Sequence, residues 1–217
     1  MQLLIFDLDG TLIDSKLDLA NSVNATRAYM GLEPITNDLV YSYVGNGAPI
    51  LLRRAMGPEM PQVEVDRALA YFLTYYGEHK LDNTCLYPGV REALDIFRDH
   101  GKKMAVLTNK PVNASRGIVD GLGIHDHFFR VYGGNSFDRK KPDPMGIERL
   151  IEEAETDPAQ TVMIGDSAVD IRTARNANVA AVGVTWGFQP ESLDEVPPDF
   201  LAHRMEQVVE WVLERKG

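Results

Sequence analysis

Residues 3–12, Leu-Leu-Ile-Phe-Asp-Leu-Asp-Gly-Thr-Leu, decide the fold of this chain. The apolar run at 3–6 is typical of a strand buried on both faces, as in a parallel sheet. The run ends in Asp7 and Asp9, and open α/β sheets bind ligands at the carboxyl ends of their strands. Because side chains two residues apart on a strand point the same way, both carboxylates can converge on one cation, and Gly10 allows a sharp turn there. Taken alone, the stretch fits equally well a strand that runs into an ordinary Asp-Gly turn.

The size and composition are those of an ordinary globular protein. The 217 residues suffice for one large domain or for one domain with an insert. No apolar stretch approaches the roughly 20 residues of a membrane span, and the N-terminus leads directly into a strand, so we expect neither a membrane segment nor a signal peptide. The single cysteine, Cys85, agrees with a reducing cytoplasm, and with no histidine nearby in sequence we expect it to be packed rather than nucleophilic.

The net charge of −10 argues against a nucleic-acid partner bound through a broad basic face. A substrate that carries phosphate would need local positive charge, and part of the excess acid could be clustered where a divalent cation neutralises it. The sequence makes no prediction of oligomeric state.

Residues 14–82 have helical periodicity and no strand pattern. The repeating positions are Leu19, Val23, Thr26 and Met30, then Val65, Leu69, Phe72 and Tyr76. From residue 83 onward strand and helix patterns alternate, with strands expected at 104–107, 128–132, 161–164 and 179–184 and a final helix around 205–212. This order predicts an α/β fold, a doubly wound (Rossmann-like) parallel sheet with a helical domain inserted after the first strand. The predicted core domain is 1–13 and 83–217, and the predicted inserted domain is 14–82.

Polar clusters follow three of the predicted strands, namely Asp7/Asp9, Thr108/Asn109 and Asp166/Asp170. All three strand ends should lie at one edge of the sheet, together with Lys141. Carboxylates that meet there would repel one another unless a cation lies among them, and hard oxygen ligands favour Mg²⁺. The five histidines lie outside these segments, and we expect His125 and His127 in a surface turn.

These groups suit phosphoryl transfer through an aspartyl-phosphate, in which a carboxylate nucleophile divides a difficult hydrolysis into two easier steps. Mg²⁺ and Lys141 would offset charge on the phosphoryl oxygens, while Thr108 Oγ and the backbone N–H groups around Asp9 and Gly10 donate hydrogen bonds. Asp9 would protonate the leaving alcohol and later deprotonate the attacking water. Asp170 could support the metal site or Lys141.

Each segment also has a purely structural interpretation. Residues 108–111 fit a turn with a helix cap, Lys141 fits a solvated surface lysine, and Asp166-Ser167 fits a helix N-cap. Four such coincidences, in order and at strand ends, favour the functional interpretation of the whole set.

Four segments resemble, in order, the four motifs of the haloacid dehalogenase superfamily of phosphatases: Asp7-Leu-Asp-Gly-Thr11, Thr108-Asn109, Lys141-Pro142 and Gly165-Asp-Ser-Ala-Val-Asp170. The resemblance extends over essentially the whole chain, and the four-motif set is highly specific. Residues 14–82 resemble that family's cap domain, which closes over the site. Within the superfamily, Val44-Gly-Asn-Gly47 and Tyr87-Pro-Gly-Val90 resemble phosphoglycolate phosphatases.

The resemblance implies a role for each matching residue. Asp7 is implied to be the nucleophile and a Mg²⁺ ligand, Asp9 the acid/base that also binds the metal through its carbonyl, and Asp166 the third protein ligand. Thr108 and Lys141 would hold the phosphoryl group. The presence of Asp9 sets the chain apart from the dehalogenase branch, which lacks that second aspartate.

Further substrate contacts are expected around this site. The expected residues are Gly10, Thr11 and Asn109 in the core, and Gly45, Asn46 and Gly47 in the cap. The two cap glycines allow the backbone to approach a small carboxylate, although a mobile hinge loop without substrate contact fits nearly as well. Of the neighbouring lysines, Lys141 fits the motif better than Lys140 because it immediately precedes a proline.

The resemblance implies a Mg²⁺-dependent phosphomonoesterase that acts on a small phosphorylated metabolite, with 2-phosphoglycolate as the leading substrate, and the cysteine content agrees with a cytoplasmic location. The alternative is a hydrolase of broader specificity for sugar phosphates or nucleotides. A phosphomutase is disfavoured because no cap motif would retain a bisphosphate intermediate. A signalling receiver also accepts phosphate on aspartate, but it needs a shorter chain and no insert. A non-catalytic binding protein is disfavoured because every expected catalytic position is filled.

Overall fold

The structure is a computed structural model that describes residues 1–215. A six-stranded sheet forms its centre, in the order β5-β4-β1-β6-β7-β8, with every neighbouring pair parallel. The strands are β1 (Leu3–Phe6), β2 (Ile13–Asp14), β3 (Cys85–Leu86), β4 (Lys103–Leu107), β5 (Arg130–Tyr132), β6 (Thr161–Gly165), β7 (Ala180–Val184) and β8 (Phe200–Ala202). The helices are α1 (Lys16–Tyr29), α2 (Asn37–Tyr41), α3 (Ala48–Met56), α4 (Gln62–His79), α5 (Val90–Asp99), α6 (Val112–Gly121), α7 (Met145–Ala154), α8 (Ala168–Asn176) and α9 (Met205–Glu214).

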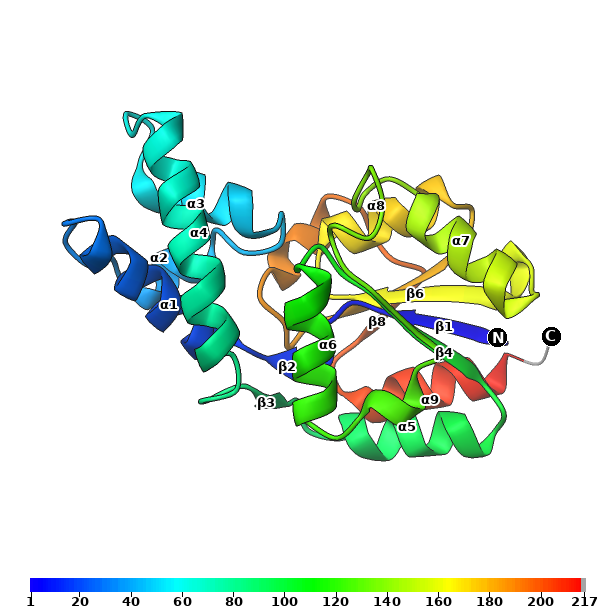
Figure 1. Cartoon of the computed structure of the whole chain (residues 1–217). Helices are drawn as coiled ribbons and strands as arrows, with labels where there is room; N and C mark the ends of the chain where they lie inside the picture. Colours follow the sequence, from blue (N-terminus) through cyan, green and yellow to red (C-terminus); the bar gives the residue numbers. More distant parts are fainter. Residues whose placement is uncertain (216–217) are drawn as a thin grey trace.

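Strand β1 lies inside the sheet, between β4 and β6, and its four residues are fully buried. Leu4 and Phe6 pack on the side of α5 and α9, while Leu3 and Ile5 pack against α7 and α8 on the other side. Figure 1 shows these helices as two layers on opposite faces of the sheet. The predicted doubly wound α/β fold is confirmed, since an apolar run without alternation is what a strand covered on both faces requires.

Helices α1 to α4 form a separate cluster beside the sheet, the blue to cyan segment in Figure 1. The chain enters this insert through β2 and leaves it through β3, and the two strands pair antiparallel, Ile13 with Leu86 and Asp14 with Cys85. The segment that leads from the insert back to the sheet is also fixed by Asp18, at the start of α1. The Asp18 carboxylate accepts hydrogen bonds from the backbone N–H groups of Asn83 (3.0 Å) and Thr84 (2.8 Å). The helical insertion after the first core strand is therefore confirmed.

Several details differ from the sequence-based expectations. Strand β5 begins at Arg130 rather than at 128, because a 3-10 turn at His125–His127 precedes it. His125 is exposed as expected, whereas the His127 side chain is only 6% exposed and contacts Asp95. Strand β8 and the β2–β3 pair have only two or three residues each, too few for a periodic pattern.

Cys85 is exposed on β3, so the expectation of a packed cysteine is wrong. Within residues 1–215, no helix has both the length and the apolar character needed to cross a bilayer.

Candidate active site

The carboxyl ends of β1, β4 and β6 meet at one edge of the sheet, the edge that faces the helical insert (Figure 1). Asp7, Thr108 and Asp166, which follow these three strands, are buried and line one cavity between the sheet and the insert. Lys141 and Asp170 line the same cavity. The structure thus brings together the strand-end residues that the sequence places at one sheet edge, because parallel strands all end on the same side.

Three carboxylates form a tight cluster in this cavity. One oxygen from each of Asp7, Asp166 and Asp170 lies within 4.8 Å of the other two. Asp166 Oδ2 accepts a hydrogen bond from Phe188 N–H (2.6 Å), which fixes the Asp166 side chain. Position 187 has no room for a side chain, because a Cβ added at Gly187 would lie 2.2 Å from the Asp166 Cβ.

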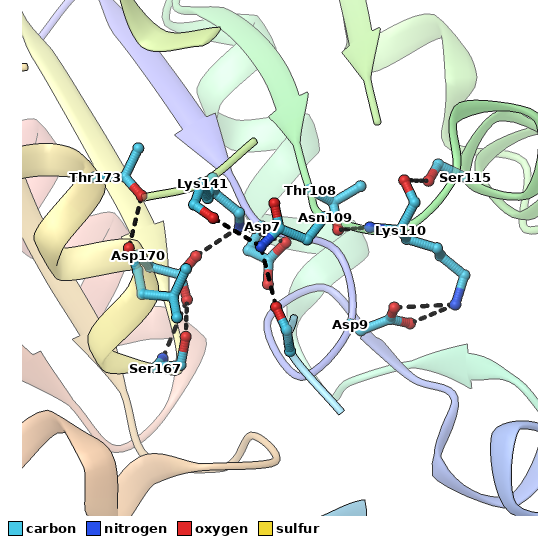
Figure 2. A network of polar contacts seen from close by, with 12 residues as sticks. Asp7, Asp9, Thr108, Asn109, Lys110, Ser115, Lys141, Ser167, Asp170 and Thr173 are labelled. Carbon is cyan, nitrogen blue, oxygen red and sulfur yellow. Dashed lines mark hydrogen bonds and ion pairs between the residues drawn. The ribbon is translucent and has the colours of Figure 1, made fainter. Parts of the chain in front are cut away.

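Lys141 supplies the positive charge inside this cluster. Its Nζ lies 2.6 Å from Asp170 Oδ1 and 2.8 Å from Asp7 Oδ1 (Figure 2). The ammonium therefore bridges Asp7, which follows β1, and Asp170 in α8. Asp170 Oδ2 meanwhile accepts hydrogen bonds from Ser167 N (3.1 Å) and Ser167 Oγ (2.7 Å) at the start of α8. Asp170 therefore holds Lys141 in place while its own orientation is fixed by the helix cap.

Burial and like charge raise the pKa of two of these acids. Burial is the largest cause of the raised pKa of Asp7, with the Lys141 ammonium opposing it. Burial, then the charges of Asp170 and Asp7, raises the pKa of Asp166 to about 8. Burial alone would lower the pKa of Lys141, but Asp170 and Asp7 outweigh it and raise that pKa, so the lysine stays charged.

The cluster fits a divalent cation. Its donors are carboxylate oxygens, the ligands of hard cations such as Mg²⁺. Among the described residues Asp7 Oδ1 has no partner with hydrogen-bond geometry, although the Lys141 ammonium is near. The residues Asp7, Asp166 and Asp170 also carry more negative charge than Lys141 neutralises. A cation here would coordinate Asp7 Oδ1 and neutralise the excess negative charge.

The raised pKa of Asp166 makes the stability of the metal-free protein depend on pH. Folded Asp166 keeps its proton up to about pH 8, whereas the unfolded carboxyl loses it near its ordinary value of 3.8. The folded state then binds more protons, so the free energy of unfolding should fall as pH rises from 5 to 8, with this group contributing at most about 1.4 kcal/mol per pH unit. Urea unfolding in EDTA measures the slope, which Asp166→Asn should flatten. Equal slopes in both proteins would contradict the prediction.

Asp9 does not join the acid cluster. Its carboxylate is held by Lys110, whose Nζ lies 2.9 Å from both oxygens (Figure 2). The Ser15 hydroxyl also donates a hydrogen bond to it. The expectation that the Asp7 and Asp9 carboxylates converge on one cation is therefore wrong. The physical reason is that the strand ends at Phe6 and the chain then turns, with Gly10 at a φ of +85°, so the alternation of an extended strand no longer applies.

A loop of the insert contacts the core beside the cavity. Asn109 Nδ2 donates hydrogen bonds to the carbonyls of Gly45 and Lys141, both at 3.1 Å. Lys140 points away from the acids, and its Nζ donates to the Asn46 carbonyl at 2.6 Å. The structure thus separates the two neighbouring lysines, Lys141 inside the cluster and Lys140 on the insert loop.

Three of the six residues expected to contact the substrate line the cavity, and three do not. Gly45, Gly47 and Asn109 line the cavity, whereas Asn46, Gly10 and Thr11 do not. A Cβ at Gly10 would lie 2.3 Å from Asp166 Oδ2, so the absence of a side chain makes room for that carboxylate. Thr11 is fully buried, and its carbonyl accepts a hydrogen bond from Trp186 Nε1 at 3.2 Å.

The sequence patterns did not identify Lys110 or the apolar wall of the insert as parts of the site. Leu51, Phe72, Leu73 and Tyr76 line the cavity opposite the acids. Phe72 and Tyr76 showed only as members of a helical stripe, which does not distinguish a core face from a cavity wall. The position of Lys110, directly after Thr108-Asn109, was the one available signal for that residue.

Comparison with known proteins places this arrangement in a family. The family model for haloacid dehalogenase-like hydrolases matches residues 4–184. A phosphoglycolate phosphatase of Vibrio vulnificus (strain YJ016) is 37% identical over 98% of this chain and 96% of its own length. A phosphoglycolate phosphatase of Agrobacterium fabrum (strain C58) is 38% identical over 91% of this chain and 86% of its own length.

A solved structure agrees with these relatives. The crystal structure of a predicted phosphoglycolate phosphatase from Haemophilus somnus 129pt has a TM-score of 0.93 and 32% identity, and the match covers 97% of both chains. The family model covers most of the chain, and the similar proteins have nearly the same length. The chain therefore belongs to the haloacid dehalogenase-like hydrolases.

Proposed function

We propose that this chain is a Mg²⁺-dependent phosphomonoesterase that acts through an aspartyl-phosphate, with 2-phosphoglycolate as its substrate. The observation that carries the proposal is the position of Asp7, a buried carboxylate in a cavity, 2.8 Å from Lys141 and beside two further acids. The relatives named phosphoglycolate phosphatase support the choice of substrate. The single cysteine supports activity in a reducing cytoplasm.

In the first step Asp7 attacks phosphorus, an oxygen–phosphorus bond forms, and the bond to the leaving alcohol breaks while Asp9 donates a proton to the alcohol oxygen. In the second step water attacks the phosphoryl group, Asp9 takes its proton, and the Asp7 carboxylate is released. Lys141 and the Thr108 hydroxyl stabilise the charge on the phosphoryl oxygens in both steps. Asp170 keeps Lys141 in position.

The proposed ligands of Mg²⁺ are Asp7, the Asp9 carbonyl and Asp166, with Asp170 in support. The cation would neutralise phosphoryl charge that Lys141 leaves uncompensated. In the proposed division of the chain, residues 14–82 form a cap over a core of 1–13 and 83–217. The contacts from Asn109 to Gly45 and from Lys140 to Asn46 support a cap that meets the core at the substrate, with Gly47 also lining the cavity.

The test is a screen for phosphate release over several dozen phosphorylated metabolites, with kcat/KM for each. EDTA should abolish release and Mg²⁺ should restore it. The ratio of kcat/KM for 2-phosphoglycolate to that for larger sugar phosphates should be about 10² or more, or roughly 2.7 kcal/mol. Similar values across sugar phosphates and nucleotides would instead support a hydrolase of broad specificity. No metal-dependent release from any ester would contradict the enzyme assignment.

A further inference from the structure

Lys110 is a second buried lysine at the cavity, and the two steps above do not use it. Its side chain is 4% exposed and forms a bidentate ion pair with Asp9. Its Nζ lies 4.5 Å from the centre of the Tyr76 ring, so it lies between the core acid and the wall of the insert. A buried cation is costly unless it is paired and its N–H donors are hydrogen-bonded.

The other cations near the site have partners elsewhere. Of the described residues that line the cavity, Lys110 and Lys141 are the cationic ones, and Lys141 is held by Asp7 and Asp170. Lys140 and Lys16 do not line the cavity, and their Nζ atoms donate to the carbonyls of Asn46 and Gly187. Of these lysines, Lys110 is the one that lines the cavity outside the acid cluster, so it is the cation placed to meet a group beyond the phosphoryl site.

The surroundings of Lys110 leave hydrogen-bonding capacity unused. An ammonium has three donors, and Asp9 accepts two of them. The Tyr76 hydroxyl, on a residue that is 3% exposed, has no partner with full hydrogen-bond geometry within residues 1–215, and the Lys110 ammonium is the charged group beside it. The neighbouring wall is apolar, with Phe72 and Leu73, which strengthens any charge pairing at this place.

We propose that Lys110 is the specificity-determining residue that binds the carboxylate of the substrate's leaving group, with the Tyr76 hydroxyl as a second donor. The inference rests on the proposed function, in which Asp9 protonates the bridging oxygen and must lie beside it. In 2-phosphoglycolate the carboxylate is one carbon away from that oxygen. A cation in contact with both Asp9 oxygens is thus within reach of the carboxylate, whereas a neutral leaving group has no charge to pair with it.

The test compares two substrates of similar size, 2-phosphoglycolate and 2-hydroxyethyl phosphate, in the presence of Mg²⁺. In Lys110→Met, the ratio of kcat/KM for 2-phosphoglycolate to that for 2-hydroxyethyl phosphate should fall about 10- to 100-fold relative to the unsubstituted enzyme, the range for a lost charged hydrogen bond. Lys110→Arg should restore part of the ratio because it keeps the charge. The matched control is Lys103→Met at the opposite, amino end of β4, which should leave the ratio unchanged.

An equal fall for both substrates would overturn the inference, because it would mean that Lys110 only positions Asp9. A second measurement does not depend on turnover. In an Asp7→Asn background, calorimetry should show that adding Lys110→Met raises the Kd of 2-phosphoglycolate about 10-fold or more, and an unchanged Kd would also overturn the inference. Failure of the unsubstituted enzyme to hydrolyse 2-phosphoglycolate would count against the proposed function instead, so the two failures are distinguishable.

Discussion

Asp7→Asn is expected to abolish phosphate release, with kcat lowered by about 10⁴-fold or more, because the amide cannot form an acyl phosphate. The substitution should leave the fold intact. Asp7 is buried beside Asp166 and Asp170, and burial already raises its pKa, so an uncharged side chain of the same shape relieves repulsion in the metal-free protein. We expect an unfolding midpoint in EDTA no lower than that of the unsubstituted protein.

The measurement is single-turnover phosphate release together with thermal unfolding. The matched control is Asp126→Asn, the same change at a side chain that is 99% exposed, and it should leave kcat unchanged. Retained turnover in Asp7→Asn would remove Asp7 as the nucleophile. A large loss of stability would instead mean that Asp7 serves mainly as the partner of Lys141.

Lys141→Met is expected to lower both activity and stability. Methionine keeps the length of the side chain but removes the charge that lies 2.6 Å from Asp170 and 2.8 Å from Asp7. Breaking a buried ion pair by removing one partner typically costs about 3–5 kcal/mol, since the remaining charge is left buried without compensation. The loss of one preorganised charge at the phosphoryl group should lower kcat by about 10²–10³-fold.

Adding Asp170→Asn separates the two effects of Lys141→Met. The second substitution removes one of the uncompensated charges, so urea unfolding should show part of the stability restored while kcat stays low. Lys103→Met is the control for removal of a lysine from the exposed end of β4. If the double variant recovered activity as well, Lys141 would act only through the folding of the site.

The core of the fold could be predicted because its strands are encoded locally. Runs such as 3–6 and 161–164 are apolar at nearly every position, and the residues that follow them are placed by parallel pairing alone. Asp7, Thr108 and Asp166 could therefore be assigned to one edge of the sheet from the order of the residues alone. Strand β8 could not be predicted, because its three residues pair only with β7 at the margin of the sheet.

The pairing of Asp9 with Lys110 depends on features that local sequence does not carry. The turn at Gly10 redirects the Asp9 side chain, and the lysine comes from the end of β4, 101 positions away. The burial of Lys110 also requires Tyr76 from the insert to lie over it. A lysine in an isolated sequence is most simply interpreted as solvated, so only the assembled molecule shows that this one is enclosed.

The pairing of β2 with β3 has a mechanical consequence. Because the outgoing and returning segments are bonded to each other, Ile13 beside Leu86, the insert is joined to the rest by one double ribbon instead of two independent tethers. A rotation of the insert relative to the sheet would therefore have to bend both strands together, which places the expected hinge at residues 13–14 and 85–86. A hinge shared by two bonded strands would keep Tyr76 of the insert in register with Lys110 of the core.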